Sequence, residues 1–176
     1  MPLLRNGAVV SDGWIDVSAD GEVPTAGDVV LPASRLLADW PGLSERNGRL
    51  GVRLANTDRP EMFQARLPRL SLIVLPFPAF NDGRAYSIAR KLREMGYAGE
   101  LRATGNVLPD QMQFMLQVGF NSFEIGDRFP IEMWSRASRQ MSLAYQRGLF
   151  RRDAESEIWT ERHTDAEAWL EQPHAG

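Results

Sequence analysis

The sequence predicts an α/β protein with a four-stranded parallel sheet, in which each strand leads into a helix. Residues 72–75 are continuously apolar, which is typical of a strand buried on both faces. Residues 83–95 carry apolar side chains at helical spacing. Gly96 and Gly119 each stand where a predicted helix ends and a strand begins. Strands that alternate with helices pair in parallel through right-handed crossovers, which allows either a half β/α barrel or a small open sheet.

Residues 1–48 are predicted to form an N-terminal β region with β-hairpin elements. Asn6-Gly7 and Asp12-Gly13 are dipeptides typical of two-residue hairpin turns. An apolar run at 29–31 follows a glycine and an aspartate, as expected for another short strand. The region therefore contributes strands and turns ahead of the strand–helix units.

Residues 49–150 are predicted to hold these units and, with the N-terminal region, to form a single domain over residues 1–150. Strands are expected at 50–55, 72–75, 100–104 and 122–125, and helices from residue 60 and at 83–95, 109–118 and 130–148. The stretch 96–101 resembles 119–125, since both run from glycine and an aromatic residue to an acid and an aliphatic residue. After residue 150 the composition becomes charged but keeps Trp159 and Trp169, so residues 151–176 are expected to be a helical or partly disordered extension.

Charge and hydropathy argue against two classes of partner. The 176 residues carry a formal net charge of −3 with a pI of about 5.5, so no basic footprint for nucleic acid is present. No apolar run approaches the roughly 20 residues of a membrane helix, and the first residues lack the features of a signal peptide. We therefore expect a cytoplasmic protein that binds neither nucleic acid nor membrane.

The residue inventory also restricts the chemistry. The chain has no cysteine, and its two histidines, His163 and His174, lie near the C-terminus outside the patterned segments. Thiolate chemistry and cysteine-bound iron–sulfur clusters are therefore excluded, and a histidine metal site or a Ser–His–Asp triad is not expected. The single lysine, Lys91, falls on the polar face of a predicted helix. The sequence thus predicts no metal and no cofactor, and it leaves open whether the protein is an enzyme.

Polar residues gather where the predicted parallel strands end, and ligands usually bind at that edge of such sheets. The candidate ligand-binding residues are Asn81, Asp82, Arg84, Arg102, Asn106, Asp110 and Gln111, and no catalytic residue is assigned. Asp82 and Asp110 are also suited to capping helices. Arg102 lies inside a strand, so it either pairs with Asp82, Asp110 or Glu100 or binds an anionic ligand. Arginines and helix N-termini at one edge favour an anion.

The segment "FNDGRAYSIARKLREMGYAGELRATGNVLPDQMQFMLQVGFNSFEI", from Phe80 to Ile125, resembles a bacterial family, domain of unknown function 934. The motifs F-x-D-G-R, G-E-L-R-A-x-G, D-Q and G-F carry the resemblance, together with "GVRLA" before the segment and "LAYQ" after it. It covers roughly residues 28–146. The residues that match motif positions are Asp82, Gly83, Arg84, Arg102, Gly105, Asp110 and Gln111, and no established role comes with them.

The resemblance implies a link to assimilatory sulfite reduction, because family members are commonly encoded beside the sulfite reductase haemoprotein. Some members are labelled as oxidoreductases, but this chain has no evident ligand for haem or an iron–sulfur cluster. We therefore expect an accessory protein of sulfur assimilation that binds the reductase or a small anion.

Two alternatives stay open beside the accessory role. One is a small, cofactor-poor α/β enzyme that uses Asp82 or Asp110 as acid or base and holds an anionic substrate with Arg84 or Arg102. The other is a scaffold without a ligand. A sheet of four strands can complete itself by dimerisation, which favours a homodimer.

Overall fold

The computed structural model describes residues 2–5, 7–79 and 81–139. The strands are β1 (Leu3–Arg5), β2 (Ala8–Val10), β3 (Trp14–Asp16), β4 (Asp28–Pro32), β5 (Leu50–Arg53), β6 (Leu70–Phe77), β7 (Glu100–Gly105) and β8 (Ser122–Glu124). The α-helices are α1 (Ala33–Ala38), α2 (Trp40–Ser44), α3 (Arg84–Glu94), α4 (Met112–Gln117) and α5 (Ile131–Arg139), and the 3-10 helices are η1 (Pro60–Arg69) and η2 (Pro109–Gln111).

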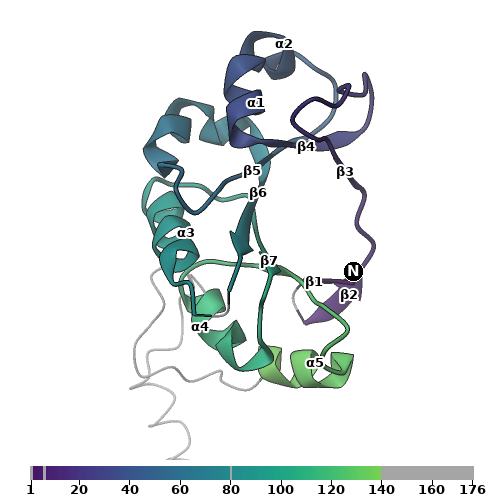
Figure 1. The fold of residues 1–176 in the computed structure, drawn as a ribbon, viewed down its shortest axis with the longest axis vertical. Coiled ribbons are helices and arrows are strands. Elements are labelled where there is room, and N and C mark those ends of the chain that lie inside the picture. Colours follow the sequence, from purple (N-terminus) through teal and green to yellow (C-terminus); the bar gives the residue numbers. More distant parts are fainter. Residues whose placement is uncertain (1, 6, 80, 140–176) are drawn as a thin grey trace, which may run out of the picture.

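The strands form one open, curled sheet of eight strands, a half barrel, in the order β2-β1-β8-β7-β6-β5-β4-β3 (Figure 1). Strands β3 to β8 run parallel, whereas β1 pairs antiparallel with both β8 and β2. The prediction of a mixed α/β fold is confirmed, but the predicted four-stranded sheet is wrong. The four expected strands are β5 to β8, and the N-terminal region adds two strands at each side of them.

The curl of the sheet follows from its connectivity. Strands β2 and β3 lie at opposite edges, yet only residues 11–13 separate them in the chain. In a flat sheet, seven strand spacings would put these edges about 34 Å apart. Four Cα–Cα steps from residue 10 to residue 14 span at most about 14 Å. The segment 11–13 can therefore connect the edges only because the sheet bends, and it runs as a chord across the open side.

The N-terminal turns differ in their outcome. Leu3 pairs with Val10 and Arg5 with Ala8, so a β1–β2 hairpin forms around Gly7, whose φ is 75°. The hairpin predicted at Asp12-Gly13 is wrong, because β2 and β3 do not pair. Asp12 instead lies in the chord, where its side chain reaches strand β7.

Helices cover one face of the sheet and enclose the main core. Helix α1 packs on β4 and β5, and α3 packs on β6. Leu75 of β6 and Ala103 of β7 are completely buried here, with Leu92 of α3 and Met115 of α4. Burial of such side chains is the main stabilising contribution to the fold.

The opposite face carries a small apolar cluster of Val30, Leu72 and Val74, on which Trp14 packs. Gly51 lies below the indole ring. A Cβ at Gly51 would lie 3.1 Å from the Cβ of Leu72 and 3.2 Å from the Trp14 ring, so the close approach of the ring depends on glycine. This contact anchors β3 to the middle of the sheet.

The two similar stretches of sequence form the same turn at the ends of α3 and α4. Each contains a glycine with positive φ, 88° at Gly96 and 109° at Gly119. The N–H of the following aromatic residue bonds to a carbonyl five residues earlier: Tyr97 to Leu92 at 3.0 Å, and Phe120 to Met115 at 3.0 Å. This is the Schellman arrangement, in which glycine adopts a left-handed conformation.

Arg93 joins these two helix ends. Its Nε and Nη2 donate to the Gly119 carbonyl at 3.0 and 2.7 Å, and its Nη1 donates to the carbonyls of Tyr97 and Gly99 at 2.6 and 3.0 Å. Burial lowers the pKa of the Arg93 guanidinium. Carbonyl groups at helix C-termini attract a cation, so the side chain fixes the spacing of α3, α4 and the strands that follow them.

The predicted helix 130–148 is described as α5 as far as Arg139. Residues 140–150 and the predicted extension 151–176 lie outside the described residues. Within the described part, no helix has the length and apolar character needed to cross a bilayer. The homodimer stays a prediction, although its argument from a four-stranded sheet no longer applies to a sheet of eight strands.

Candidate functional site

Side chains connect the three loops that leave β5, β6 and β7 at the carboxyl edge of the sheet. Asn56 follows β5, and its Nδ2 donates to Asp82 Oδ2 at 3.1 Å. Asn106 follows β7; its Nδ2 donates to the Pro78 carbonyl at 2.7 Å, and its backbone N–H donates to the Phe77 carbonyl at 2.8 Å. The carboxyl edge is therefore an assembled surface rather than three independent loops.

Gly105 allows this close contact between the ends of β6 and β7. Its φ is 87°, and a Cβ there would lie 2.6 Å from the Phe77 carbonyl oxygen. Backbone atoms cannot move away as a flexible side chain can, so only glycine fits. Asn106, the next residue, is thereby aimed at the loop that carries Asp82.

Asp82 and Arg84 form the centre of the edge. The Arg84 backbone N–H donates to Asp82 Oδ1 at 3.1 Å, and the guanidinium donates from Nε to Oδ1 at 2.9 Å and from Nη2 to Oδ2 at 2.7 Å. These bonds from Arg84, followed by the one from Asn56, hold the pKa of the Asp82 carboxyl well below its usual range. The Arg84 side chain is 58% exposed, whereas that of Asp82 is 13% exposed. The carboxylate thus orients a guanidinium that faces solvent.

Asp110 and Gln111 lie in η2, which leads into α4. Asp110 is exposed, and its charge adds to burial in raising the pKa of the Tyr86 hydroxyl on α3. The Tyr86 ring packs edge-on against Phe77 of β6 and against the exposed Phe114 of α4, with centroids 5.1 and 4.9 Å apart. These contacts place η2 and α4 beside the first turns of α3. Asn81 is exposed in the loop that carries Asp82.

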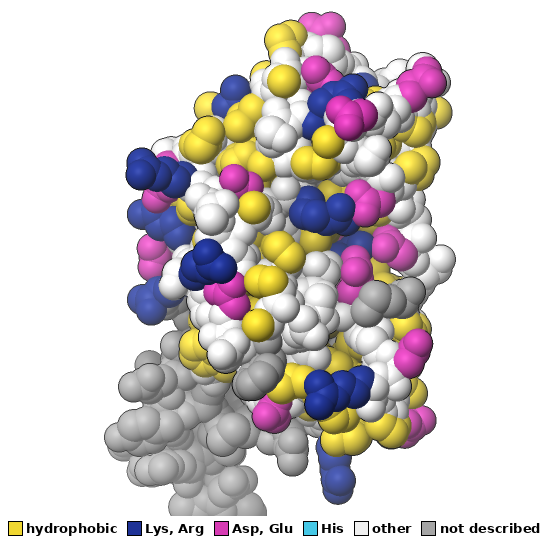
Figure 2. All heavy atoms as spheres, viewed as in Figure 1, with side chains coloured by type: hydrophobic (Ala, Val, Ile, Leu, Met, Phe, Trp, Pro, Cys, Tyr) yellow, Lys and Arg dark blue, Asp and Glu magenta, His cyan; other side chains and the backbone are white. Residues whose placement is uncertain are grey.

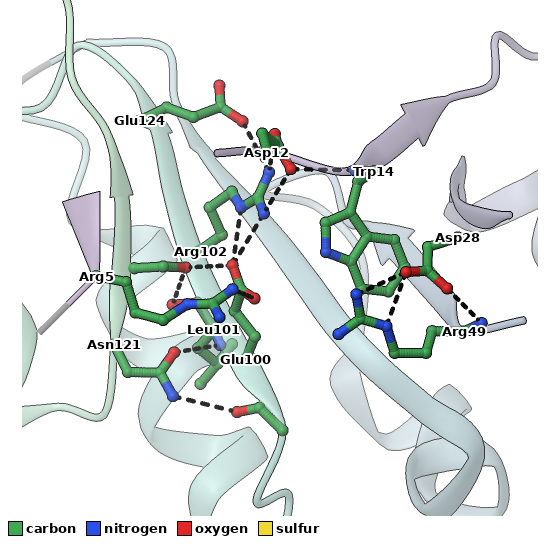
Figure 3. Close-up of polar contacts among 12 residues, drawn as sticks. Arg5, Asp12, Trp14, Asp28, Arg49, Glu100, Leu101, Arg102, Asn121 and Glu124 are labelled. Atoms are coloured by element: carbon green, nitrogen blue, oxygen red, sulfur yellow. Dashed lines mark hydrogen bonds and ion pairs between the residues drawn. The ribbon is translucent and has the colours of Figure 1, made fainter. Parts of the chain in front are cut away.

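Arg102 has a different environment. Its side chain is 2% exposed and bonds to carboxylates: Asp12 at 2.7 and 3.3 Å, Glu100 at 3.1 and 2.9 Å, and Glu124 at 3.5 Å (Figure 3). Burial by itself would lower the pKa of the guanidinium, but the bonds to Asp12 and Glu100 outweigh it and raise the pKa. Of its three proposed structural partners, Glu100 is confirmed as a partner, and Arg102 makes its bonds away from the carboxyl edge.

Glu100 connects this cluster to the rest of the sheet. Its carboxylate also binds Arg5 of β1 and accepts a hydrogen bond from the Ser122 hydroxyl of β8 at 2.8 Å. Its side chain is 11% exposed. Arg102 and Glu100 therefore link β1, β7, β8 and the chord through charge-assisted hydrogen bonds, which are stronger than neutral ones.

The structure separates the candidate residues into two sites. Asn81, Asp82 and Asn106 are in loops of the carboxyl edge, Arg84 is the first residue of α3 at that edge, and Asp110 and Gln111 are beside it in η2. Arg102 belongs to the charged cluster with Glu100. Sequence reasoning did not identify Asp12, whose only local signal was a turn dipeptide. In the described part of the chain, no group of three or more His, Asp and Glu side chains is placed to hold a metal ion.

These features define a half-barrel α/β protein with a polar carboxyl edge and a buried charged cluster on the face opposite the helices. The chain belongs to a family described as bacterial protein of unknown function, domain of unknown function 934, whose model matches residues 51–155. The matched range begins in β5 and includes both Arg84 and Arg102, whereas β1 to β4 and the chord precede it. No curated protein matches the chain.

Proposed function

We propose that the protein is an accessory protein of sulfur assimilation, which acts with assimilatory sulfite reductase by binding the reductase or a small anion at the carboxyl edge. The pathway rests on the family resemblance carried by the motifs between Phe80 and Phe120. The location rests on the assembled loops that Asn56 and Asn106 connect. Arg84 is the residue that makes the contact.

The observation that carries this proposal is the fixed orientation of an exposed guanidinium. Nε and Nη2 of Arg84 donate hydrogen bonds to Asp82. The third nitrogen of the guanidinium, Nη1, is therefore the one that can donate to a ligand. A guanidinium held in place loses less conformational entropy on binding than a mobile one. Its planar array of donors suits the oxygens of a carboxylate, sulfite or sulfate group.

A second observation supports a ligand at this edge. The Oδ1 atom of Asn56 is shielded from solvent, and within the described residues it has no hydrogen-bond partner. A buried acceptor without a partner costs free energy. Because the Nδ2 of the same amide bonds to Asp82, this acceptor lies next to the Asp82–Arg84 pair.

An accessory role fits Asp82 better than acid–base catalysis does. A general base works best when its pKa lies near the pH at which the reaction runs. Hydrogen bonds from Arg84 instead move the pKa of Asp82 away from neutrality, which stabilises the carboxylate and makes it a weak base. The carboxylate is therefore suited to positioning Arg84.

The surface charges favour recognition of a partner by individual side chains over long-range electrostatic attraction by a region of one charge sign. Figure 2 shows acidic and basic side chains interspersed on one face of the molecule. Surface pairs of opposite charge include Arg49 with Asp28 and Arg53 with Asp16. The fields of two adjacent opposite charges largely cancel at a distance. The partner is therefore selected by local geometry at Arg84.

The proposal is tested in cells from which the gene has been deleted. Growth on sulfate is compared with growth on cysteine after return of the wild type, Arg84→Met or Arg90→Met. Arg90 lies on the same helix, is 57% exposed and pairs with Glu94, so it is a matched control for Arg84. We expect Arg84→Met to fail on sulfate only. Normal growth of the deletion strain on sulfate would disprove the role in sulfur assimilation.

A further inference from the structure

We propose that Arg102 is the binding position for a small carboxylate. The chord, residues 11–13, acts as a strap that keeps this position occupied with the chain's own Asp12. The site lies on the face opposite the helices and is separate from the carboxyl edge. In this arrangement Asp12 acts as an internal ligand, and a free carboxylate competes with it for the same guanidinium.

The geometry of Asp12 is that of a bound ligand rather than of a core residue. Its Oδ2 accepts from Arg102 Nη1 at 2.7 Å, and its Oδ1 accepts from Nη2 at 3.3 Å, which is a two-point contact (Figure 3). The Asp12 side chain is still 34% exposed, while Arg102 is 2% exposed. The carboxylate therefore reaches the buried guanidinium from the solvent side.

The strap is held mainly through that side chain. Residues 11–13 are exposed and belong to no strand. A Cβ added at Gly13 would have no neighbouring atom within 4 Å, so the backbone there is not packed against the sheet. Asp12 also accepts the Trp14 backbone N–H at 3.2 Å, which ties the strap to the start of β3. Release of Asp12 from Arg102 frees the middle of the strap without breaking a strand pair.

An incoming monocarboxylate can replace the Asp12 carboxylate without a change in the net charge of the cluster. With Asp12 in place, two guanidinium groups, Arg5 and Arg102, face three carboxylates, Asp12, Glu100 and Glu124. Loss of Asp12 removes one partner of Arg102 Nη1 and Nη2, which keep their contacts to Glu124 and Glu100, and it leaves two guanidinium groups facing two carboxylates. A monocarboxylate restores the original charge balance, whereas a larger or doubly charged anion meets repulsion from Glu100 and Glu124.

Tethering explains why the wild type keeps the site closed. A group attached to the same chain has an effective concentration of about 1 mM or more, so a free monocarboxylate must exceed that level to compete. The strap therefore sets a threshold: at high carboxylate concentration, the ligand binds Arg102 in place of the Asp12 side chain, while residues 11–13 still connect β2 to β3.

The test uses acetate as the probe and the full chain with ¹⁵N-labelled arginine. Acetate is titrated against the wild type, Asp12→Ala and Asp16→Ala, while the Nε–H resonance of Arg102 is followed by NMR at constant ionic strength set with chloride. Asp16 is the matched control, because it lies in β3, pairs with Arg53 and is 54% exposed. We expect acetate to shift the Arg102 resonance in Asp12→Ala with an affinity at least about tenfold higher than in the wild type or Asp16→Ala.

Equal acetate responses in the wild type and Asp12→Ala, or no shift of the Arg102 resonance in Asp12→Ala, would overturn the proposal. If Asp12→Ala does not fold, the same titration is made with Asp12→Asn, which keeps the acceptor for the Trp14 N–H and loses the charge. Asp12→Asn must then also bind acetate more tightly than Asp16→Ala does.

Discussion

The carboxylate of Asp82 binds Arg84 at two places, the backbone N–H at the start of α3 and the guanidinium at the end of the side chain. The first contact stabilises the helix N-terminus, and the second holds a charged group toward solvent. Asp82, which precedes the N-cap residue Gly83, thus contributes to the helix N-terminus and also positions the candidate binding group.

Replacement of Asp82 separates these two roles. Asp82→Ala removes both contacts, so we expect a lower free energy of unfolding, because the first turn of α3 loses its acceptor. Asp82→Asn keeps an oxygen for the Arg84 N–H and loses the charge, so it should retain more of the stability while weakening partner binding. Urea unfolding and a binding assay on the same samples measure both effects. Equal stability of Asp82→Ala and the wild type would argue against the cap.

The same carboxylate gives a predicted pH dependence. The pKa of Asp82 in the folded state lies below the value of about 3.9 expected for an unfolded aspartate. The contribution of the carboxylate to the free energy of unfolding is therefore fully present above about pH 3.9 and is lost as the pH falls below it. We expect the difference in unfolding free energy between the wild type and Asp82→Asn to be constant from pH 5 to 7 and to shrink below about pH 4. A difference that grows on acidification would contradict the folded-state hydrogen bonds.

The two helix-ending glycines provide a matched pair for a stability test. Gly96→Ala places a Cβ where no atom lies within 4 Å, so its cost is the left-handed conformation, about 1–2 kcal/mol. Gly119→Ala has the same conformational cost and also puts the Cβ 2.5 Å from Arg93 Cγ. We expect Gly119→Ala to be the more destabilising substitution in chemical denaturation. Equal losses would show that Arg93 moves aside freely.

Arg93 itself should contribute far more to stability than the exposed Arg90 on the same helix. Arg93→Met leaves the carbonyls of Gly119 and Tyr97 without this donor and leaves Gly99 with only the long bond from Asn121, which should cost about 1–3 kcal/mol. Arg90→Met removes only an exposed pair with Glu94 and should cost at most about 0.5 kcal/mol. Thermal unfolding of both variants measures these losses of stability. Losses of similar size in the two variants would contradict the prediction.

The central half of the fold could be predicted because its signals are local. Apolar strand residues such as 72–75 and the glycines at 96 and 119 identify strands and helix ends without knowledge of their neighbours. The sheet edges could not be predicted in this way. β1 pairs with β8 across more than 100 residues, and β3 is a three-residue strand whose place depends on Trp14 packing over Gly51. The turn dipeptide at Asp12 therefore suggested a hairpin that does not form.

The candidate site shows the same limit. From the sequence, Asp82 is predicted to cap α3; the N-cap residue is Gly83, one position later, but the predicted hydrogen bond from the Arg84 N–H to the Asp82 side chain is present. Arg102 required a partner, and Glu100, two residues away, was within reach of sequence reasoning. Asp12 lies 90 residues from Arg102 in the chain, and no local pattern connects them. Contacts made by the curl of the sheet are visible only in three dimensions.

The most direct test of the central claim is the dissociation constant between the purified protein and the sulfite reductase haemoprotein, measured for the wild type, Arg84→Met and Arg90→Met. Parallel calorimetric titrations with sulfite and sulfate identify a small anion as the ligand if the haemoprotein does not bind. The account predicts that Arg84→Met weakens binding of the haemoprotein or the anion at least about tenfold, a loss of roughly 1.4 kcal/mol, while Arg90→Met binds as the wild type does. Identical dissociation constants for all three proteins, or no binding of either partner by the wild type, would contradict it.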